Sequence, residues 1–323
     1  MEPEVFSLFS NALRKQVEAL GWERATDIQA LSIPEILKGE NVLLIAPTGT
    51  GKTEAAVFPI FEQFVRERCR SLPKGISILY ITPLRALNRD IFRRLIEVGE
   101  NLGIKVQVRH GDTVQHVRRM QALHPPDMLI TTPETLQAIL PGKRMAKHLS
   151  CVRWVVVDEI HELATDKRGA QLSIGLERLR KLMSRDFQRV GLSATIGSPE
   201  VIAGFLGGLG RDCRVLKTVE AKDLEVWVES PTPGAEDRRV AREVMLSPGG
   251  VKRILRLFEL IDDYKSSLVF TNTREHAEAL SSRMIALKPE VMVGVHHGSL
   301  SRDVRVEAEK NLKEGRLKAV VCT

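Results

Sequence analysis

The chain has 323 residues, of which 43% are hydrophobic and 28% are charged, so it is too long for one ordinary core and is neither largely disordered nor fibrous. Its 48 Lys and Arg against 41 Asp and Glu give a net charge of +7 at pH 7, a balance that suits an anionic partner such as nucleic acid without establishing one. No apolar run approaches the roughly 18–20 residues that span a bilayer, the N-terminus is acidic where a signal peptide would be basic, and the four cysteines lack the spacing of a metal site. We therefore expect a cytoplasmic protein with two domains and no membrane partner.

The first half of the chain alternates short β-branched apolar runs with longer helical patterns, which is typical of parallel strands joined by crossover helices. This pattern predicts an α/β fold. Because ligands of open parallel sheets bind at the carboxyl ends of the strands, polar residues directly after each run are the first candidates for a site. The expected strands are residues 42–46, 76–82, 105–109, 128–132, 154–157 and 190–193.

A stretch with four glycines at residues 204–210 is expected to form the hinge between two domains, residues 1–207 and residues 208–323. After it we expect a strand over residues 224–228 and a surface loop over residues 230–250, which is rich in Pro, Gly and charge. Further expected strands are residues 267–271, 291–296 and 318–322, alternating with helices over residues 251–261, 274–287 and 303–312. Since no crossover helix follows the last strand, we expect the second domain to be incomplete.

The run Ala-Pro-Thr-Gly-Thr-Gly-Lys-Thr at residues 46–53 follows an expected strand and opens an expected helix, which is the context of a phosphate-binding loop. Its glycines permit the tight turn that points backbone N–H groups at a polyphosphate, although Ala46 replaces the glycine that usually begins the motif. The Lys52 ammonium can reach the β- and γ-phosphates, and the Thr53 hydroxyl can bind Mg²⁺. We therefore expect ATP and Mg²⁺ as cofactors. The expected binding residues are Thr48, Gly49, Thr50, Gly51, Lys52 and Thr53.

Two carboxylates, Asp158 and Glu159, directly follow the expected strand at residues 154–157. Asp158 is expected to hold the Mg²⁺ together with Thr53, and Glu159 to orient and deprotonate the attacking water. Acids in a solvated turn after a buried strand would look the same, but the presence of Lys52 disfavours that interpretation. His161 is expected to relay the state of the site to neighbouring loops.

These motifs keep the order and spacing of a known family. The chain resembles the superfamily 2 helicases of the DExH type, most of all the large helicase-related (Lhr) proteins of archaea and bacteria. The resemblance implies two tandem RecA-like lobes, with parallel sheets flanked by helices, that bind ATP between them and nucleic acid across both. It implies a monomeric ATP-dependent 3′ to 5′ helicase or translocase that acts on DNA rather than RNA, with RNA–DNA hybrids as a further substrate. The runs that carry it are residues 39–54, 82–88, 158–161, 191–196, 268–274 and 296–302.

The resemblance also implies roles for particular residues. Gln29 takes the position that reads adenine, and a carboxamide can pair with adenine N6 and N7. Ser193 and Thr195 take the positions that couple the state of the phosphates to closure of the lobes. The implied nucleic-acid contacts are strand-end loop residues suited to phosphate oxygens. They are Thr82, Pro83, Arg85, Gly111, Asp112, Thr132, Pro133, Thr271, Arg274, His297 and Gly298.

Two alternatives stay open at this point. One is an RNA helicase of the DEAD-box kind, which the Asp-Glu-Ile-His run at residues 158–161 disfavours. The other is an inactive module that binds nucleic acid in a nucleotide-dependent way, because the sequence contains no Gln-x-x-Arg-x-x-Arg run, which the family uses to reach the γ-phosphate from the second lobe. An arginine of this kind is worth about 10³–10⁵ in turnover. We therefore expect residues 1–323 alone to bind ATP and nucleic acid but to hydrolyse ATP slowly.

Overall fold

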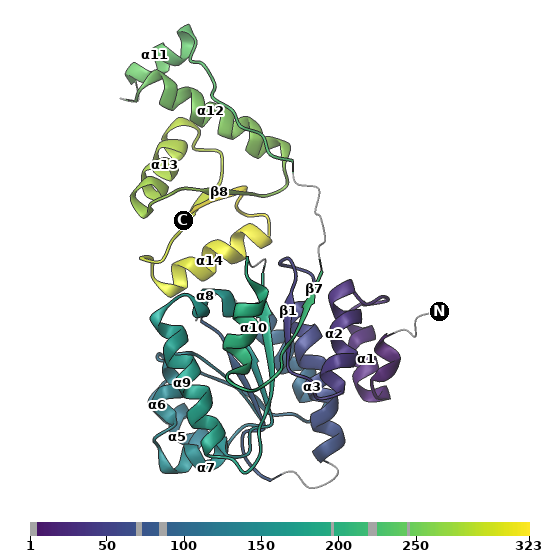
Figure 1. Ribbon diagram of the computed structural model, residues 1–323. Helices are drawn as coiled ribbons and strands as arrows, with labels where there is room; N and C mark the ends of the chain where they lie inside the picture. The colour runs from purple at the N-terminus through teal and green to yellow at the C-terminus, as the bar shows by residue number, and fades with distance from the viewer. Residues whose placement is uncertain (1–4, 69–72, 84–88, 195–196, 219–224, 244–245) are drawn as a thin grey trace. The chain divides into compact units, whose positions relative to one another are not determined.

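The computed structural model describes residues 5–68, 73–83, 89–194, 197–218, 225–243 and 246–323 (Figure 1). The chain divides into two compact units, unit 1 at Met1–Lys222 and unit 2 at Asp223–Thr323. Each unit has its own sheet and its own buried core. No helix of the described residues is long and apolar enough to cross a membrane.

Unit 1 is built on a parallel sheet. Its strands are β1 (Val42–Ile45), β2 (Ile78–Ile81), β3 (Val106–Arg109), β4 (Met128–Thr131), β5 (Trp154–Val157), β6 (Gln188–Ser193) and β7 (Arg214–Lys217). They form one seven-stranded sheet in the order β3-β4-β2-β5-β6-β1-β7, and every pair is parallel. The prediction of an α/β fold with parallel strands is confirmed.

Helices cover both faces of this sheet (Figure 1). On β1, Val42 and Leu44 belong to the core on one face, while Leu43 and Ile45 belong to the core on the other. Because side chains alternate along a strand, a sheet covered on both sides needs continuous apolar runs, which is what the sequence supplies. The helical elements are η1 (Val5–Leu8), α1 (Asn11–Ala19), α2 (Asp27–Leu37), α3 (Lys52–Arg68), α4 (Arg89–Asn101), α5 (Gln115–Leu123), α6 (Pro133–Ile139), α7 (Lys143–Leu149), α8 (Ile160–Ala164), α9 (Lys167–Lys181) and α10 (Pro199–Gly207).

The division between the units lies later in the chain than the glycine-rich stretch suggests. Gly204 lies within α10 and Gly207 ends it, and Gly208 and Gly210 have φ of 76° and 72° in the turn that follows. The chain then returns to the sheet of unit 1 as β7, which pairs with β1 along its whole length. The glycines therefore form a turn within unit 1, and unit 1 ends at Lys222 rather than at residue 207.

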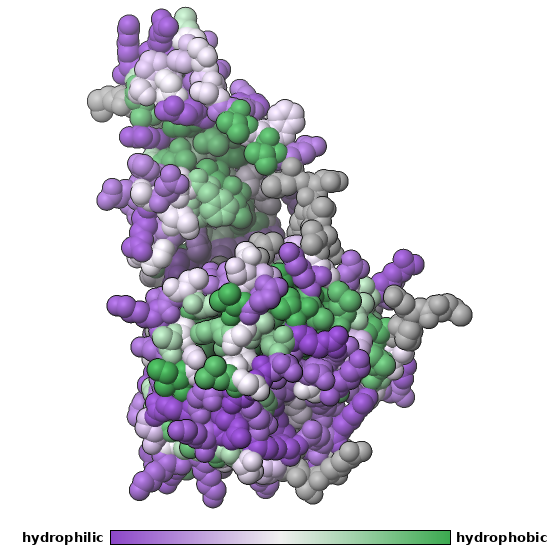
Figure 2. All heavy atoms as spheres, in the orientation of Figure 1, coloured by the Kyte–Doolittle hydropathy of each residue, from purple (hydrophilic) through white to green (hydrophobic). Residues whose placement is uncertain are grey.

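Unit 2 has a parallel sheet of three strands in the order β8-β10-β9. Side chains of α12 and α13 pack with the middle strand around Phe258, Met284 and Val321. On β8, Leu268 and Phe270 are 57% and 73% exposed, and Figure 2 shows apolar atoms gathered on the visible face of this unit. Its elements are α11 (Ala235–Glu243), α12 (Pro248–Asp263), β8 (Ser267–Phe270), α13 (Arg274–Leu287), β9 (Val293–His296), α14 (Arg302–Lys313) and β10 (Ala319–Cys322).

Two predictions for unit 2 are wrong. Residues 225–228 form no strand, because no strand of the described residues pairs with them, and Leu224 lies outside the described residues. The expected loop at residues 230–250 contains α11 and the start of α12. Asp237 accepts a hydrogen bond from the Gly234 backbone N–H at 2.6 Å, and acidic residues in the first turn favour a helix there. The high content of Pro, Gly and charged residues over residues 230–250 as a whole predicted a loop and so missed this short helix.

Candidate functional site

The predicted nucleotide residues meet at one edge of the unit 1 sheet. The phosphate-binding loop follows β1, Ser193 ends β6, and Asp158 and Glu159 follow β5. Since β5, β6 and β1 are neighbours, their carboxyl ends bring these residues together.

The phosphate-binding loop has the backbone that its glycines allow. Gly49 and Gly51 have φ of 87° and 79°, in the left-handed region that side chains disfavour. Lys52 begins α3, and its ammonium donates to the carbonyl oxygens of Ala46 and of Pro47, the latter at 3.3 Å. The carbonyl oxygens at the start of the loop thus hold the Lys52 ammonium against the loop.

The beginning of α2 braces this loop. Gln29 is only 2% exposed, and its Oε1 accepts a hydrogen bond from the Thr26 backbone N–H at 3.1 Å. The Thr26 hydroxyl donates to the carbonyl oxygen of Thr50 at 2.8 Å. Gly51 is favoured by its φ of 79°, and a Cβ added there would lie 2.6 Å from Gln29 Nε2, so the buried Gln29 carboxamide would have to move. Gln29 is therefore a buried member of the site, not an exposed helical residue.

Asp158 is a buried carboxylate, 5% exposed, directly after β5. Its Oδ2 accepts a hydrogen bond from the Tyr80 hydroxyl at 2.7 Å, and its Oδ1 accepts one from the Glu159 backbone N–H at 3.0 Å. Burial raises the pKa of Asp158 to about 6, against the hydrogen bond from Tyr80. Burial also lowers the pKa of Lys52, which the charges of Glu159 and Asp158 oppose.

Glu159 stands in a backbone conformation that is rare for a residue with a side chain. Its φ is 47° and its ψ is 42°, in the left-handed region, at the residue before α8. Such a conformation costs roughly 1–2 kcal/mol and persists where surrounding structure enforces it, often at functional sites. The strained turn fixes the point from which the Glu159 side chain leaves the strand end.

His161 connects the acidic pair to the end of β6. Its Nδ1 lies 2.9 Å from Ser193 Oγ and 3.5 Å from Glu159 Oε2. The structure thus brings together three residues that the sequence analysis assigned to catalysis and coupling. Thr195 lies outside the described residues.

Gln29, residues 48–53 and the acidic pair Asp158 and Glu159 line a cleft of about 330 Å³ within unit 1, whereas His161 and Ser193 are not among its lining residues. Sequence reasoning missed Trp22, Arg24 and Arg94, which also line the cleft. It missed Glu54 as well, which is 4% exposed and pairs with Arg94 of α4 at 2.9 Å. The position of Glu54 directly after Lys52 and Thr53 was an available signal, whereas the other three reach the site only through the fold.

The nucleic-acid candidates of unit 1 follow the other half of the sheet. Strands β2, β4 and β3 are neighbours, and their ends lead to Thr82 and Pro83, to Thr132 and Pro133, and to Gly111 and Asp112. Of these residues, Gly111 and Asp112 are exposed and the other four are buried. Arg85 lies outside the described residues.

Arg168 of α9 ties two of these loops together. It donates to the carbonyl oxygen of Pro83 at 2.9 Å and to Glu134 Oε1 at 2.5 Å. Thr132 caps α6 by accepting a hydrogen bond from the Thr135 backbone N–H at 3.4 Å. The Thr82 hydroxyl, in contrast, has no hydrogen-bond partner among the described residues.

The nucleic-acid candidates of unit 2 gather at the ends of β8 and β9. Arg274 begins α13, and its guanidinium donates to Ser299 Oγ at 2.7 Å, beside Gly298. The Cys322 carbonyl oxygen accepts a hydrogen bond from the Thr271 backbone N–H and lies 3.3 Å from Thr271 Oγ1. His297 is buried and its Nε2 lies 2.9 Å from Glu278 Oε1, so its imidazole packs inside unit 2.

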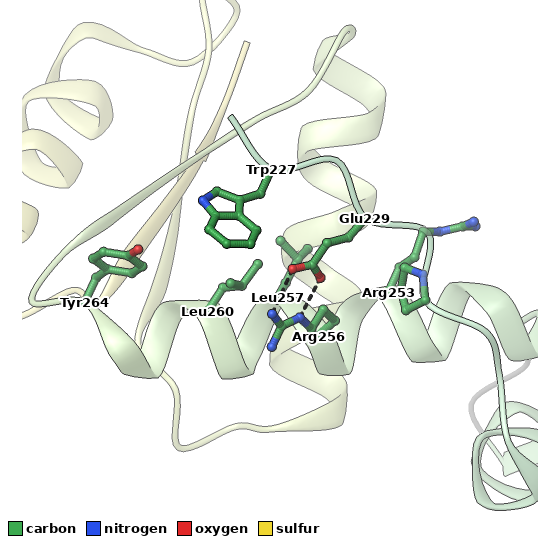
Figure 3. Close-up of a pocket in the computed structure, with 8 residues that line it drawn as sticks. Trp227, Glu229, Arg253, Arg256, Leu257, Leu260 and Tyr264 are labelled. Carbon is green, nitrogen blue, oxygen red and sulfur yellow. Dashed lines mark hydrogen bonds and ion pairs between the residues drawn. The ribbon is translucent and has the colours of Figure 1, made fainter. Parts of the chain in front are cut away.

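A separate cavity of about 530 Å³ lies on unit 2 (Figure 3). Trp227 and Tyr264 stand at its sides, Leu260 lies between them on α12, and Arg256 forms two hydrogen bonds with the Glu229 carboxylate. None of the residues predicted for the site lines it. Within the described residues, no group of three or more His, Cys, Asp and Glu side chains could hold a metal ion.

Two family descriptions match the chain. Residues 26–202 match the family described as DEAD/DEAH box helicase, and residues 251–323 match the helicase conserved C-terminal domain. The first match begins at the residue that caps α2 and covers every nucleotide candidate named above.

Curated relatives are similar over nearly the whole chain. The ATP-dependent helicase Lhr-Core of Methanothermobacter thermautotrophicus is 39% identical over 92% of this chain, which is 36% of the relative's length. The Lhr helicase/probable uracil glycosylase of Mycolicibacterium smegmatis is 35% identical over 97% of this chain and 23% of its own. The chain thus spans about a third or less of the length of these relatives.

Solved structures are similar in fold. The Mycobacterium smegmatis helicase Lhr bound to ssDNA and AMP-PNP has a TM-score of 0.81 and 35% identity, over 99% of this chain and 42% of that chain. A DEAD-box helicase bound to ssRNA has a TM-score of 0.77 at 20% identity, over 100% of this chain and 66% of that chain, a likeness of fold alone.

Proposed function

We propose that this chain, which belongs to the DEAD/DEAH box helicase family, is the core of an ATP-dependent helicase or translocase that moves along nucleic acid. The observation that carries the proposal is the order of strands in unit 1. Strands β1, β6 and β5 end in the nucleotide residues, and strands β2, β4 and β3 end in the nucleic-acid candidates. One continuous sheet edge therefore joins a site that can cleave ATP to loops that can hold a phosphate backbone.

The residues at the cleft suit a magnesium ion and a triphosphate. A buried carboxylate oxygen of Asp158 and the hydroxyl of Thr53 are the hard oxygen donors that Mg²⁺ prefers, and Lys52 supplies a cation beside them. When bound, Mg²⁺ neutralises charge on the β- and γ-phosphates. The backbone N–H groups of the loop bind and orient the phosphates, because the glycines point them at the anion.

Glu159 is the proposed general base. Its backbone is strained at the end of β5, and this conformation fixes where its carboxylate begins. The carboxylate accepts a proton from the water that attacks the γ-phosphate. His161 lies between that carboxylate and Ser193, so it can pass a change at the phosphates to the end of β6. The breakage of the terminal phosphate bond is thereby linked to movement of loops around it.

The finer assignments are part of the same proposal. We propose DNA as the principal substrate, since the Mycobacterium smegmatis structure at 35% identity is bound to ssDNA. The 3′ to 5′ direction, the monomeric state and the use of Gln29 to read adenine are implied by the family resemblance, and the cytoplasmic location is an expectation from the sequence. They are predictions for this chain and for the longer proteins it resembles.

The nucleotide site is tested by replacing its cation and its base. Lys52→Ala should abolish binding of a fluorescent ATP analogue, while Lys38→Ala, which removes an exposed lysine of the same unit, should not. Glu159→Gln should keep the affinity for the analogue but lower ATP hydrolysis by about 10²–10⁴. Hydrolysis by Glu159→Gln within roughly a factor of ten of the parent chain would show that Glu159 is not the base.

The substrate is tested by measuring ATP hydrolysis with no polymer, with single-stranded DNA and with single-stranded RNA. We expect DNA to stimulate hydrolysis most, because DNA is the proposed substrate and its phosphate backbone would contact loops on the same sheet edge as the nucleotide site. Stimulation by RNA alone would favour an RNA helicase of the DEAD-box kind. No stimulation by either polymer would leave only a nucleotide-dependent binding module.

A further inference from the structure

Tyr80 is a fully buried tyrosine whose hydroxyl contacts a residue of the nucleotide site. It stands near the carboxyl end of β2, and its hydroxyl donates to Asp158 Oδ2 at 2.7 Å. The phenol therefore donates directly to the carboxylate that is proposed to hold Mg²⁺.

The ring of Tyr80 is also fixed by the element that follows β2. Phe92 of α4 meets it edge to face, with ring centroids 5.9 Å apart and planes at 84°. Edge-to-face pairs have a preferred geometry and are worth about 0.5–1.5 kcal/mol beyond the burial of area. A shift of α4 relative to the sheet would therefore change the position of the Tyr80 ring.

The segment that carries the first nucleic-acid candidates runs between these two contacts. It begins at Thr82, two residues after Tyr80, and reaches α4 three residues before Phe92. Arg168 holds its beginning through the carbonyl oxygen of Pro83. Tyr80 and its aromatic partner Phe92 thus flank, along the chain, a connection that begins at the nucleic-acid candidates Thr82 and Pro83.

We propose that Tyr80 is a positioning residue that holds the Asp158 carboxylate in the orientation needed for Mg²⁺ and couples that carboxylate to nucleic acid bound at Thr82 and Pro83. The inference rests on the proposed function, because it takes Asp158 as the ligand of Mg²⁺. Partners that orient a metal ligand without touching the metal commonly change metal affinity when they are removed. Tyr80 reaches the reacting phosphates only through Asp158.

The test measures the affinity of the chain for a fluorescent non-hydrolysable ATP analogue, in Mg²⁺ and in EDTA, with and without a single-stranded DNA oligonucleotide. Tyr80→Phe should weaken binding in Mg²⁺ by about 10-fold or more and change binding in EDTA by less than roughly twofold. It should also reduce the effect of the oligonucleotide on nucleotide affinity. The matched control is Tyr264→Phe, since the chain has two tyrosines and Tyr264 is exposed on unit 2.

A second variant keeps the hydroxyl and loosens only the contact with α4. Phe92→Leu should retain the affinity for the Mg²⁺-bound analogue yet reduce the effect of DNA upon it. Equal affinities of Tyr80→Phe and the parent chain in Mg²⁺, or equal losses in Mg²⁺ and in EDTA, would overturn the inference by showing no role or a structural role. If the parent chain itself binds the analogue equally well in Mg²⁺ and in EDTA, the assignment of Asp158 to Mg²⁺ fails, and the inference fails with it.

Discussion

The carboxyl group of Asp158 shows how one residue can be prepared for a ligand at the expense of stability. Burial raises its pKa from 3.8 to about 6, while the hydrogen bond from Tyr80 and the charge of Lys52 lower it. The folded state therefore binds this proton more tightly than the unfolded state does. The contribution of Asp158 to stability is fully present below pH 3.8, is lost as the pH rises to about 6, and stays lost above it.

Asp158→Asn should remove this pH dependence. We expect the free energy of unfolding of the variant, minus that of the parent chain, to rise by up to about 3 kcal/mol between about pH 4 and pH 7. Urea unfolding at several pH values, in EDTA and without nucleotide, measures this difference. A difference that is flat across the range would contradict a raised pKa in the folded state.

Several site residues could be predicted from sequence because their signals are local. Lys52 belongs to a contiguous loop motif, and Asp158 and Glu159 come directly after a buried strand. Tyr80 could not be found in this way, since it is one apolar-run residue among several and meets Asp158 only where β2 and β5 pair. Arg94 likewise reaches Glu54 through the packing of α4 against α3.

At the scale of elements, hydrophobic pattern predicted every strand of the unit 1 sheet except β7. The runs of β1 and β5 are apolar at every position because both faces of the sheet are covered. β7 has only two apolar residues, and as an edge strand it forms because β1 offers a partner. The converse error was the strand expected over residues 224–228, where the composition favoured a strand but the described residues 225–228 pair with no other strand of the described residues.

Two helical glycines make a matched test of how tightly these elements pack. A Cβ at Gly169 of α9 would lie 2.0 Å from the carbonyl oxygen of Leu163 in α8, whereas a Cβ at Gly204 of α10 would meet nothing within 4 Å. Gly169→Ala should therefore lower the free energy of unfolding by about 1–3 kcal/mol, because a backbone atom must move. Gly204→Ala should leave stability unchanged or raise it by about 0.5–1 kcal/mol.

Chemical denaturation of both variants measures the two effects. Because α8 carries His161, Gly169→Ala should also slow ATP hydrolysis more than Gly204→Ala does. Equal stability of the two variants would mean that the backbone at the junction of α8 and α9 can move to accept the added Cβ with no loss in the free energy of unfolding.

For the whole molecule, the order of motifs along the chain predicted both the fold and the family. The expected resemblance to superfamily 2 helicases of the Lhr type is confirmed by the family matches and the curated relatives. The exact division into units could not be predicted, because it depends on which sheet β7 joins. Sequence order fixes which loops exist, and strand order decides which of them become neighbours.

The salt dependence of nucleic-acid affinity distinguishes attraction by the net charge of the chain from direct contacts between single cations and phosphates. The net charge of +7 attracts any polyanion, whereas each cation that neutralises a phosphate of a single strand adds about 0.7 to the slope of log affinity against log salt. Arg274 lies beside Gly298 at the end of the unit 2 sheet, among the proposed contacts. Arg253 lines the separate cavity on α12 and is not among them.

Arg274→Gln and Arg253→Gln change the net charge equally, so they distinguish the two effects. Binding of labelled single-stranded DNA, measured over a range of salt concentrations, should show a slope shallower by about 0.7 for Arg274→Gln and nearly unchanged for Arg253→Gln. Equal slopes for both variants would mean that Arg274 makes no phosphate contact and that only the overall charge attracts the strand. A change confined to Arg274→Gln would show that the end of the unit 2 sheet contacts the phosphate backbone, as the proposed function expects.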